Sequence, residues 1–363
     1  MMGELRLMKG NEVIAEAAIR CGCDAYFGYP ITPQSEVMET LMERKPWEET
    51  GMIVLQAESE VAAINMVYGG AGAGKKVMTS SSSPGISLKQ EGITYIAGAE
   101  LPCLVVNVVR GGPGLGTIQP AQSDYFQAVK GGGHGDYKLI VLAPNSVQEM
   151  NDFVDLGFEL AFKYRNPVMI LSDGIIGQMM EKVELSEYKP RLTDEEIVKR
   201  YGSWATTGKT KNRPRNVITS LELDSARQEV FNHKLIKKYQ TIEENEVRYE
   251  NFHTDDAEYL IVAYGSSSRI SKKAVEMARE KGIKVGLLRP ITLFPFPKKE
   301  LAKLSKQVKG ILTVEMSAGQ MIEDVKLGVN CSIPVEHYGR LGGMIPSPDE
   351  IVTALEQKII GGK

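Results

Sequence analysis

The sequence of 363 residues contains little cysteine, little excess charge and no long apolar run. Its four cysteines, Cys21, Cys23, Cys103 and Cys331, are scattered, and their spacing fits neither a disulfide framework nor the closely spaced run that ligates an iron–sulfur cluster. The net charge of −3 is too small to indicate attraction to nucleic acid or to a membrane surface. These absences favour a protein of the reducing cytoplasm.

Signals for membrane insertion and secretion are also missing. No apolar run approaches the roughly 18 residues of a membrane-spanning helix, and residues 1–6 lack the apolar centre of a secretory signal. Hydrophobic residues make up 42% of the sequence and charged residues 25%, as in ordinary globular proteins. The length predicts two or perhaps three domains.

Residues 1–180 alternate between amphipathic helical patterns and short apolar strands. The nearly continuous apolar run 101–109 is typical of a central parallel strand. Asn11 is expected to cap the first helix, and Ser146 with Glu149 a helix that reaches about residue 164. Further strands are expected at 25–28, 52–55, 76–79, 138–142 and 168–171, and further helices at 35–44 and 58–68. The pattern predicts an α/β fold with a parallel sheet covered on both faces.

Residues 181–257 interrupt this alternation, since more than a third of them are charged. We interpret the basic stretch 209–215 as a solvated loop, with contact to an acidic partner as the alternative. The alternation resumes at 258, and Ser347 with Pro348 and Glu350 opens the last helix. The expected organisation is a domain over 1–180, a charged connector over 181–257 and a smaller α/β domain over 258–363.

Two short motifs resemble phosphate or metal sites and are rejected. Residues 69–76 almost spell a phosphate-binding loop, but Lys76 stands where a hydroxyl residue is required. A helix precedes these glycines and a strand follows them, which is the reverse of that motif's order. Asp173-Gly174 faintly resembles the GDG of a thiamine diphosphate magnesium motif, but no asparagine pair follows near residue 200. No metal site is predicted for this chain.

Polar residues at the ends of expected strands are the candidates for a functional site. Arg110 ends the strongest strand and could anchor a carboxylate or form a structural ion pair. The hydroxyl-rich segment 79–85 could line a polar pocket or form an ordinary turn. Glu58 and Glu60 begin a helix, where acids often only complement the helix dipole. These residues alone leave each alternative open.

Taken together, five segments resemble the alpha subunit of 2-oxoacid:ferredoxin oxidoreductases over essentially the whole chain. The matching segments are Tyr29-Pro30-Ile31-Thr32-Pro33, residues 56–63 around Glu60, residues 82–88 around Ser83-Pro84-Gly85, residues 288–297 and residues 315–320. The chain departs from the family pattern at Ser83, where glycine is commonest, and at Ser317, where asparagine is usual. Residues 112–116 and 131–136 look closest to members that act on branched-chain 2-oxoacids.

The resemblance implies two thiamine-diphosphate-enzyme-like domains, a pyrimidine-binding parallel-sheet domain and a transketolase C-terminal-like domain. It implies that Glu60 hydrogen-bonds the pyrimidine ring of thiamine diphosphate as the catalytic residue. It implies that Thr32 and Arg110 hold the carboxylate of the substrate. The expected cofactor-binding residues are Tyr29, Pro30, Ile31, Glu60, Ser83, Pro84 and Gly85.

Because the GDG motif with its asparagine pair is absent, the resemblance implies that this chain holds only the pyrimidine half of a shared cofactor. Mg²⁺ and [4Fe-4S] clusters are then expected in partner subunits. The expected partners are a beta subunit with the GDG motif, a gamma subunit, a ferredoxin-like delta subunit, ferredoxin, the 2-oxoacid and coenzyme A.

The implied reaction converts a 2-oxoacid, coenzyme A and oxidised ferredoxin to an acyl-CoA, carbon dioxide and reduced ferredoxin. The subgroup resemblance favours a branched-chain substrate such as 3-methyl-2-oxobutanoate, with 2-oxoglutarate and pyruvate as alternatives. A transketolase-like or dehydrogenase E1-like subunit, a non-catalytic assembly subunit and a nucleotide-binding module are the rival hypotheses.

Overall fold

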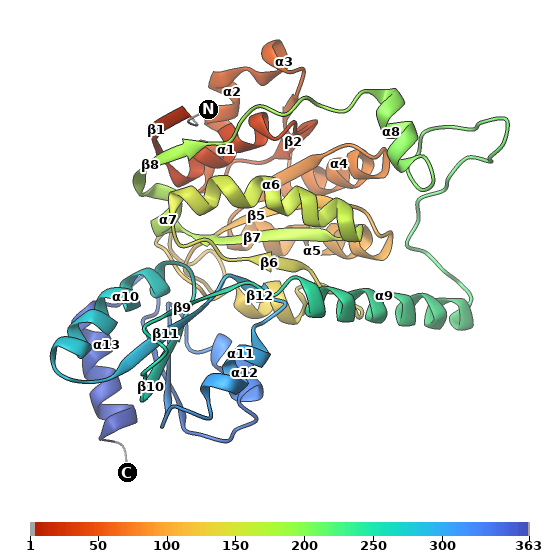
Figure 1. The fold of residues 1–363 in the computed structure, drawn as a ribbon. Helices are drawn as coiled ribbons and strands as arrows, with labels where there is room; N and C mark the ends of the chain where they lie inside the picture. Colours follow the sequence, from red (N-terminus) through yellow and green to blue (C-terminus); the bar gives the residue numbers. More distant parts are fainter. Residues whose placement is uncertain (1–3, 362–363) are drawn as a thin grey trace.

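The computed structural model describes residues 4–361, which fold into two α/β units joined by a long segment (Figure 1). The first unit contains a seven-stranded sheet and the second a five-stranded sheet. In sheet order, the first consists of β12 (Thr292–Phe294), β6 (Ile140–Leu142), β7 (Pro167–Asp173), β5 (Cys103–Val109), β4 (Val77–Ser81), β2 (Ala25–Gly28) and β3 (Ile53–Gln56). The second consists of β14 (Val335–Gly339), β13 (Ile311–Glu315), β10 (Tyr259–Ala263), β11 (Val285–Pro290) and β9 (Tyr249–Phe252).

Helices surround both sheets, and Figure 1 shows α6 across the front of the first sheet with α5 behind it. In the first unit and the connecting segment they are α1 (Gly10–Arg20), α2 (Ser35–Arg44), α3 (Pro46–Glu49), α4 (Glu60–Gly72), α5 (Ser83–Gly98), α6 (Val147–Tyr164), α7 (Gly174–Gln178), α8 (Asp194–Tyr201) and α9 (Ser225–Asn245). In the second unit they are α10 (Gly265–Glu280), α11 (Lys298–Leu304), α12 (Met321–Gly328) and α13 (Pro348–Leu355). Two π-helical turns occupy Gln127–Gly131 and Glu356–Ile360.

The predicted α/β class and the parallel sheet are confirmed. β5, the expected central strand, is fourth of the seven strands, and every one of its residues is buried. Its neighbours β4 and β7 run parallel to it. Helices on both faces remove water from a parallel sheet, which explains why this strand is almost wholly apolar. The carboxyl ends of β2, β4 and β5 therefore lie together along one edge.

The two units are linked by more than the charged segment. β12 comes from the second half of the chain but pairs antiparallel with β6, on the edge of the first sheet. β9 lies within the expected connector but pairs antiparallel with β11 of the second sheet. A two-stranded sheet of β1 (Glu4–Lys9) and β8 (Met180–Leu185) also ties the start of the connector to the first unit. The domain boundaries given above stay a prediction.

Two predicted helix caps differ from the structure. Asn11 lies inside α1, and its amide donates to the Pro33 carbonyl at 2.6 Å and to Glu36 at 2.9 Å, so the predicted cap is wrong. Ser146 does cap α6, accepting from the Glu149 amide, but the Glu149 carboxylate accepts from the Asn145 amide. The capping box at Ser347 forms as predicted. Within residues 4–361 no helix is long and apolar enough to cross a bilayer.

Candidate functional site

Glu60 is the first residue of α4 and lies at the carboxyl edge of the first sheet. Ser59 caps this helix by accepting a hydrogen bond from the Ala62 amide at 3.2 Å. Glu60 is only 7% exposed, yet within residues 4–361 its carboxylate accepts no hydrogen bond. A buried carboxylate normally finds donors, because leaving water without compensation is costly. Glu60 therefore has hydrogen-bonding capacity that the described chain does not use.

Gly85 brings the backbone of α5 against Glu60. A Cβ atom at this position would lie 2.7 Å from Oε1 of Glu60 and 2.1 Å from Oγ of Ser81. No larger residue fits there without moving one of these groups. At the start of α5, Ser82 is the N-cap and Pro84 lies in the first turn of the helix. The family resemblance groups Glu60 with Ser83, Pro84 and Gly85. The structure places Glu60 of α4 against Gly85 of α5.

Ser83 joins the start of α5 to the end of β5. Its hydroxyl donates to the Arg110 carbonyl at 3.1 Å and accepts from the Arg110 amide at 3.1 Å. The Ser83 amide donates to Oδ1 of Asn107 at 3.2 Å. Asn107 in turn donates to Oδ2 of Asp124 at 2.9 Å. The serine that departs from the family pattern therefore holds Arg110 in register with α5.

Arg110 is buried, with 8% of its surface exposed, and forms no ion pair among residues 4–361. Its guanidinium donates from Nη1 to the Thr32 carbonyl at 2.9 Å and from Nη2 to the Leu115 carbonyl at 3.1 Å. Its Nε has no partner. Backbone carbonyls do not neutralise a buried cation, so the structural ion pair considered above is absent. The site retains a positive charge suited to an incoming carboxylate.

The Tyr29–Thr32 loop follows β2 at the same edge. Tyr29 and Ile31 are half-buried, whereas Pro30 and Thr32 are exposed. Gln34 holds this loop by donating to the Tyr29 carbonyl at 3.4 Å. The structure thus gathers the segments of all the predicted site residues at one edge, with Arg110 contacting Thr32 and Ser83, and Glu60 contacting Gly85.

Three residues of this edge were not predicted. Asn107 and Asp124 support Ser83, and burial raises the pKa of Asp124 above its usual value while hydrogen bonds from Asn107 and Ser83 oppose the rise. Lys89 on α5 is completely buried. A polar residue inside the apolar strand 103–109 was a signal that could have identified Asn107. Asp124 and Lys89 carry no such signal, because acids and lysines are common on solvated faces.

Unpartnered polar atoms cluster at this edge. The hydroxyls of Ser81 and Ser82 are buried and have no hydrogen-bond partner, as does Nε of Arg110. Buried polar atoms of this kind are rare in a finished protein interior, and each needs a ligand or water. Together with the unused Glu60 carboxylate, they suit a polar ligand that donates and accepts hydrogen bonds.

Asp173, the residue of the faint GDG resemblance, has its carboxylate fully engaged. Its Oδ1 accepts from the Ile175 amide at 2.9 Å and from the Ser266 hydroxyl at 2.6 Å. It therefore caps α7 and joins the two units. Within residues 4–361, no group of three or more His, Cys, Asp or Glu side chains is arranged to hold a metal ion.

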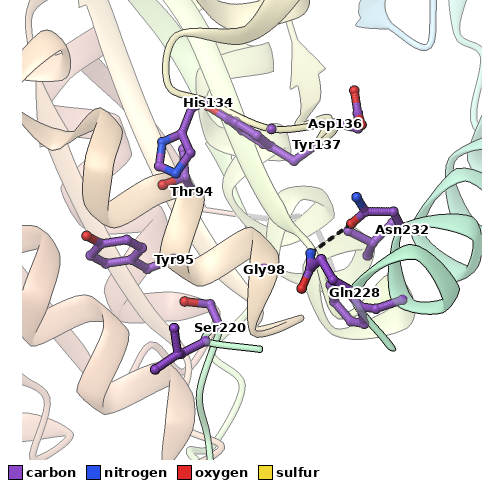
Figure 2. Close-up of a pocket in the computed structure, with 13 residues that line it drawn as sticks. Thr94, Tyr95, Gly98, His134, Asp136, Tyr137, Ser220, Gln228 and Asn232 are labelled. Atoms are coloured by element: carbon purple, nitrogen blue, oxygen red, sulfur yellow. Dashed lines mark hydrogen bonds between the residues drawn. The ribbon is translucent and has the colours of Figure 1, made fainter. Parts of the chain in front are cut away.

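A separate cavity of about 420 Å³ lies between α5, the loop before β6 and the start of α9 (Figure 2). None of the predicted site residues is in its lining. His134 and Asp136, from the glycine-rich segment 131–136, do line it. In Figure 2, Gln228 and Asn232 of α9 face the cavity and are joined by a hydrogen bond of 3.1 Å. One of the two segments that resemble branched-chain family members, 131–136, thus lines a cavity that contains none of the predicted site residues.

Comparisons with known proteins identify two matching family models and several relatives. Residues 16–251 match the profile described as pyruvate flavodoxin/ferredoxin oxidoreductase, thiamine diP-bdg. Residues 257–351 match pyruvate:ferredoxin oxidoreductase core domain II. The chain is 51% identical over 352 residues to ketoisovalerate oxidoreductase subunit VorB of Methanothermobacter marburgensis, covering 97% of both chains.

Solved structures also resemble the fold. A 2-oxoglutarate:ferredoxin oxidoreductase from Magnetococcus marinus, with 2-oxoglutarate, coenzyme A and succinyl-CoA bound, matches with a TM-score of 0.83 and 28% identity. That match covers 98% of this chain and 66% of the other. A split gene transketolase, an inactive beta4 tetramer, matches with a TM-score of 0.60 and 12% identity over 98% of this chain and 99% of the other. The second likeness concerns the fold alone.

Proposed function

This chain belongs to the pyruvate flavodoxin/ferredoxin oxidoreductase family, and from this membership we propose that it is the alpha, pyrimidine-binding subunit of a 2-oxoacid:ferredoxin oxidoreductase. The observation that carries the proposal is the buried Glu60 side chain, whose carboxylate has no hydrogen-bond donor within residues 4–361, at the carboxyl edge of the sheet. A second chain would supply the diphosphate-binding half of the cofactor site.

The residues at the edge fit the pyrimidine half of thiamine diphosphate. Gly85 lets the α5 backbone approach Glu60 and Ser81 closely, and the hydroxyls of Ser81 and Ser82 have no hydrogen-bond partner among the described residues, so they are free to bond a ring substituent. When bound, this cofactor supplies the nucleophilic carbon and the electron sink for decarboxylation. Glu60 would hold the proton that it shares with a pyrimidine nitrogen.

Arg110 and Thr32 would orient the substrate. The guanidinium presents its remaining N–H groups to the carboxylate of a 2-oxoacid, and the exposed Thr32 lies beside it, bonded through its carbonyl. A fixed carboxylate places the neighbouring carbonyl carbon at one position over the cofactor, and such positioning lowers the entropic part of the barrier. Ser83 keeps Arg110 in place through its backbone.

A branched-chain 2-oxoacid such as 3-methyl-2-oxobutanoate is the substrate that we propose, with coenzyme A as acyl acceptor. The support is the relative named ketoisovalerate oxidoreductase, which is 51% identical over nearly the whole chain. The solved oxidoreductase with 2-oxoglutarate bound is only 28% identical. Electrons would pass to [4Fe-4S] clusters and ferredoxin outside this chain, and Mg²⁺ would be held by the partner with the GDG motif. Beta, gamma and ferredoxin-like delta subunits complete the proposed complex.

Reconstitution tests this function. The chain, alone and co-expressed with candidate partner subunits, is supplied with thiamine diphosphate, Mg²⁺ and coenzyme A, and reduction of ferredoxin is followed with three 2-oxoacids. We expect no turnover by the chain alone and the highest kcat/KM for 3-methyl-2-oxobutanoate in the complex. Turnover by the isolated chain, or sugar or lipoamide transfer without ferredoxin reduction, contradicts the proposal. A preference for pyruvate or 2-oxoglutarate contradicts only the substrate.

A further inference from the structure

Gln320, the last residue of the family segment 315–320, makes its side-chain contacts with the other unit. It is the N-cap residue of α12. Its Nε2 donates to the Ser123 carbonyl at 2.8 Å, and its Oε1 accepts from the Phe126 amide at 2.8 Å. Both ends of the side-chain amide are therefore used on one short stretch of backbone. Because these two contacts lie on either side of Asp124, one side chain of the second unit fixes the position of Asp124.

Asp124 directs its carboxylate to β5 of the first unit. Its Oδ2 accepts from Nδ2 of Asn107 at 2.9 Å. Burial raises the pKa of this carboxyl, and the hydrogen bonds that oppose the rise come from Asn107 and Ser83, with no cation contributing. A partly buried acid without an ion pair is kept at a cost to stability. This cost indicates that Asp124 does more than join the two units.

Asn107 transmits this constraint because its side-chain amide has two different ends. An ionised carboxylate only accepts hydrogen bonds, so Asp124 binds the NH₂ end and leaves Oδ1 of Asn107 directed at α5. There Oδ1 accepts from the Ser83 amide at 3.2 Å. The Ser83 hydroxyl in turn bonds the amide and the carbonyl of Arg110, both at 3.1 Å. A continuous series of hydrogen bonds thus runs from the second unit to Arg110.

We propose that Gln320 and Asp124 are positioning residues for Arg110. Through Gln320 the second unit fixes Asp124. Asp124 orients the Asn107 amide toward Ser83, and the arginine is thereby kept at one position. The family segment that ends at Gln320 thus contributes to substrate binding in the first unit. The part of this inference that concerns the substrate rests on the proposed function, whereas the series of hydrogen bonds exists without it.

Steady-state kinetics of the reconstituted complex test the role in substrate binding. Gln320→Ala removes both contacts with the first unit, and Asp124→Ala removes the acceptor for Asn107. We expect each to raise KM for the 2-oxoacid about fivefold, the effect of one lost hydrogen bond, with kcat lowered less and the affinity for thiamine diphosphate unchanged. Asp124→Asn keeps an oxygen that can accept from Asn107, so it should restore most of the wild-type KM.

Three results would overturn the positioning role. The first is an unchanged KM in either alanine variant. The second is a KM of Asp124→Asn as high as that of Asp124→Ala, because the orienting contact would then not be what matters. The third is a loss confined to cofactor affinity.

Tyr125→Phe is the matched control, because Tyr125 is the neighbour of Asp124 and also joins the two units. Its hydroxyl donates to Oδ2 of Asp324 on α12 at 2.7 Å and does not bond Asn107. We expect Tyr125→Phe to lower Tm and to keep the wild-type KM. An equal rise in KM would mean that any loosening between the units weakens substrate binding, and would overturn the specific role of Gln320 and Asp124.

A double-mutant cycle in denaturant unfolding of the full chain tests the series of hydrogen bonds without substrate or cofactor. Gln320 and Ser83 share no contact, and substitutions at sites without shared partners have nearly additive effects on stability. If the series couples them, Gln320→Ala combined with Ser83→Ala should shift the unfolding midpoint by less than the sum of the two single shifts. With Tyr125→Phe in place of Gln320→Ala, the shifts should add.

The cycle separates this inference from the proposed function. Additive shifts for Gln320→Ala and Ser83→Ala, or equal coupling in the control cycle, would overturn the inference whatever the complex catalyses. Coupled shifts in a chain whose wild-type complex turns over no 2-oxoacid would uphold the series of hydrogen bonds and overturn the proposed function.

Discussion

The two α/β units each contain a buried glutamate at the carboxyl edge of their sheet, but the two carboxylates differ in the hydrogen bonds that they accept. Glu315, at the end of β13, accepts from the Ser317 hydroxyl at 3.0 Å, from the Met321 amide at 2.9 Å and from the Ile322 amide at 3.1 Å. Glu60 in the first unit accepts no hydrogen bond within residues 4–361. Glu315, with none of its surface exposed, therefore has hydrogen-bond donors around its carboxylate, whereas Glu60, 7% exposed, has none among the described residues.

Two buried arginines, Arg289 and Arg110, differ in the same way in their acidic partners. Arg289 on β11 is 2% exposed and pairs with Glu149 and Glu250. Arg110 is 8% exposed and has no acidic partner among the described residues. Buried charges with partners stabilise a fold, and buried charges without them are kept at a cost to stability. The difference supports the proposal that the first unit keeps its glutamate and arginine for ligands. In the second unit, Glu315 holds the start of α12, and Arg289 binds Glu149 of α6 and Glu250 of β9.

Glu60→Gln makes the sharpest test of this contrast. We expect turnover of the reconstituted complex to fall by about 10³-fold, the range of an acid–base group. Tm should change little, because no hydrogen bond inside the chain is lost. Steady-state kinetics and a thermal melt of the same preparation measure both quantities. Full activity, or a large loss of Tm, would break the contrast.

Arg110→Ala tests the arginine half of the contrast. We expect kcat/KM for the 2-oxoacid to fall by about 100-fold, the equivalent of roughly 3 kcal/mol for a lost charge-assisted contact. KM should rise and kcat should fall, with the affinity for thiamine diphosphate nearly unchanged. Isothermal titration with the cofactor is the decisive control, since a weakened cofactor affinity would assign Arg110 to the wrong ligand. Arg289→Ala should instead lower Tm.

Glu315→Gln is the counterpart in the second unit. An amide cannot accept from every donor that surrounds Glu315, so we expect a loss of about 3 kcal/mol in the free energy of unfolding. Denaturant unfolding of the full chain measures this loss. Any complex that still assembles should keep the wild-type KM. An unchanged unfolding midpoint would show that the hydrogen bonds at α12 do not stabilise the fold.

Ser83→Ala should give the smallest effect. It removes the hydroxyl that bonds both the amide and the carbonyl of Arg110, and we expect a loss of about 1 kcal/mol, seen as a several-fold rise in KM. Ser87→Ala on the same helix is the control, because the Ser87 hydroxyl bonds the Ser83 carbonyl and not Arg110. An equal KM change in both variants would argue against a role for Ser83 in placing Arg110.

Much of the first sheet could be predicted because its strands are local patterns. The apolar run 101–109 contains β5, and the expected helix at 58–68 overlaps α4. The strands β8, β9 and β12 were missed, since each pairs with a strand far away in the sequence and carries no strong apolar pattern. The cap predicted at Asn11 failed for a similar reason, because its side chain bonds the distant residues Pro33 and Glu36.

The candidate site was predictable where a motif marks it and hidden where only packing creates it. Glu60, Thr32, Ser83 and Arg110 came from the family resemblance, and the structure brings their segments to one edge. Their catalytic and binding roles stay predictions. Lys89 could not be found in this way, because in the sequence it is one lysine among many on helices. Its burial follows from the approach of α5 to β4, which no local pattern encodes.

The short strand β12 has a consequence for any attempt to divide this polypeptide. By pairing with β6 it closes one border of the first sheet. A fragment that stops before Thr292 would leave β6 with a free row of amides and carbonyls, and such borders recruit strands from other molecules. Truncated forms should therefore aggregate. If a gene encoded this polypeptide as two chains divided between residues 142 and 292, each chain would tend to self-associate until it bound the other.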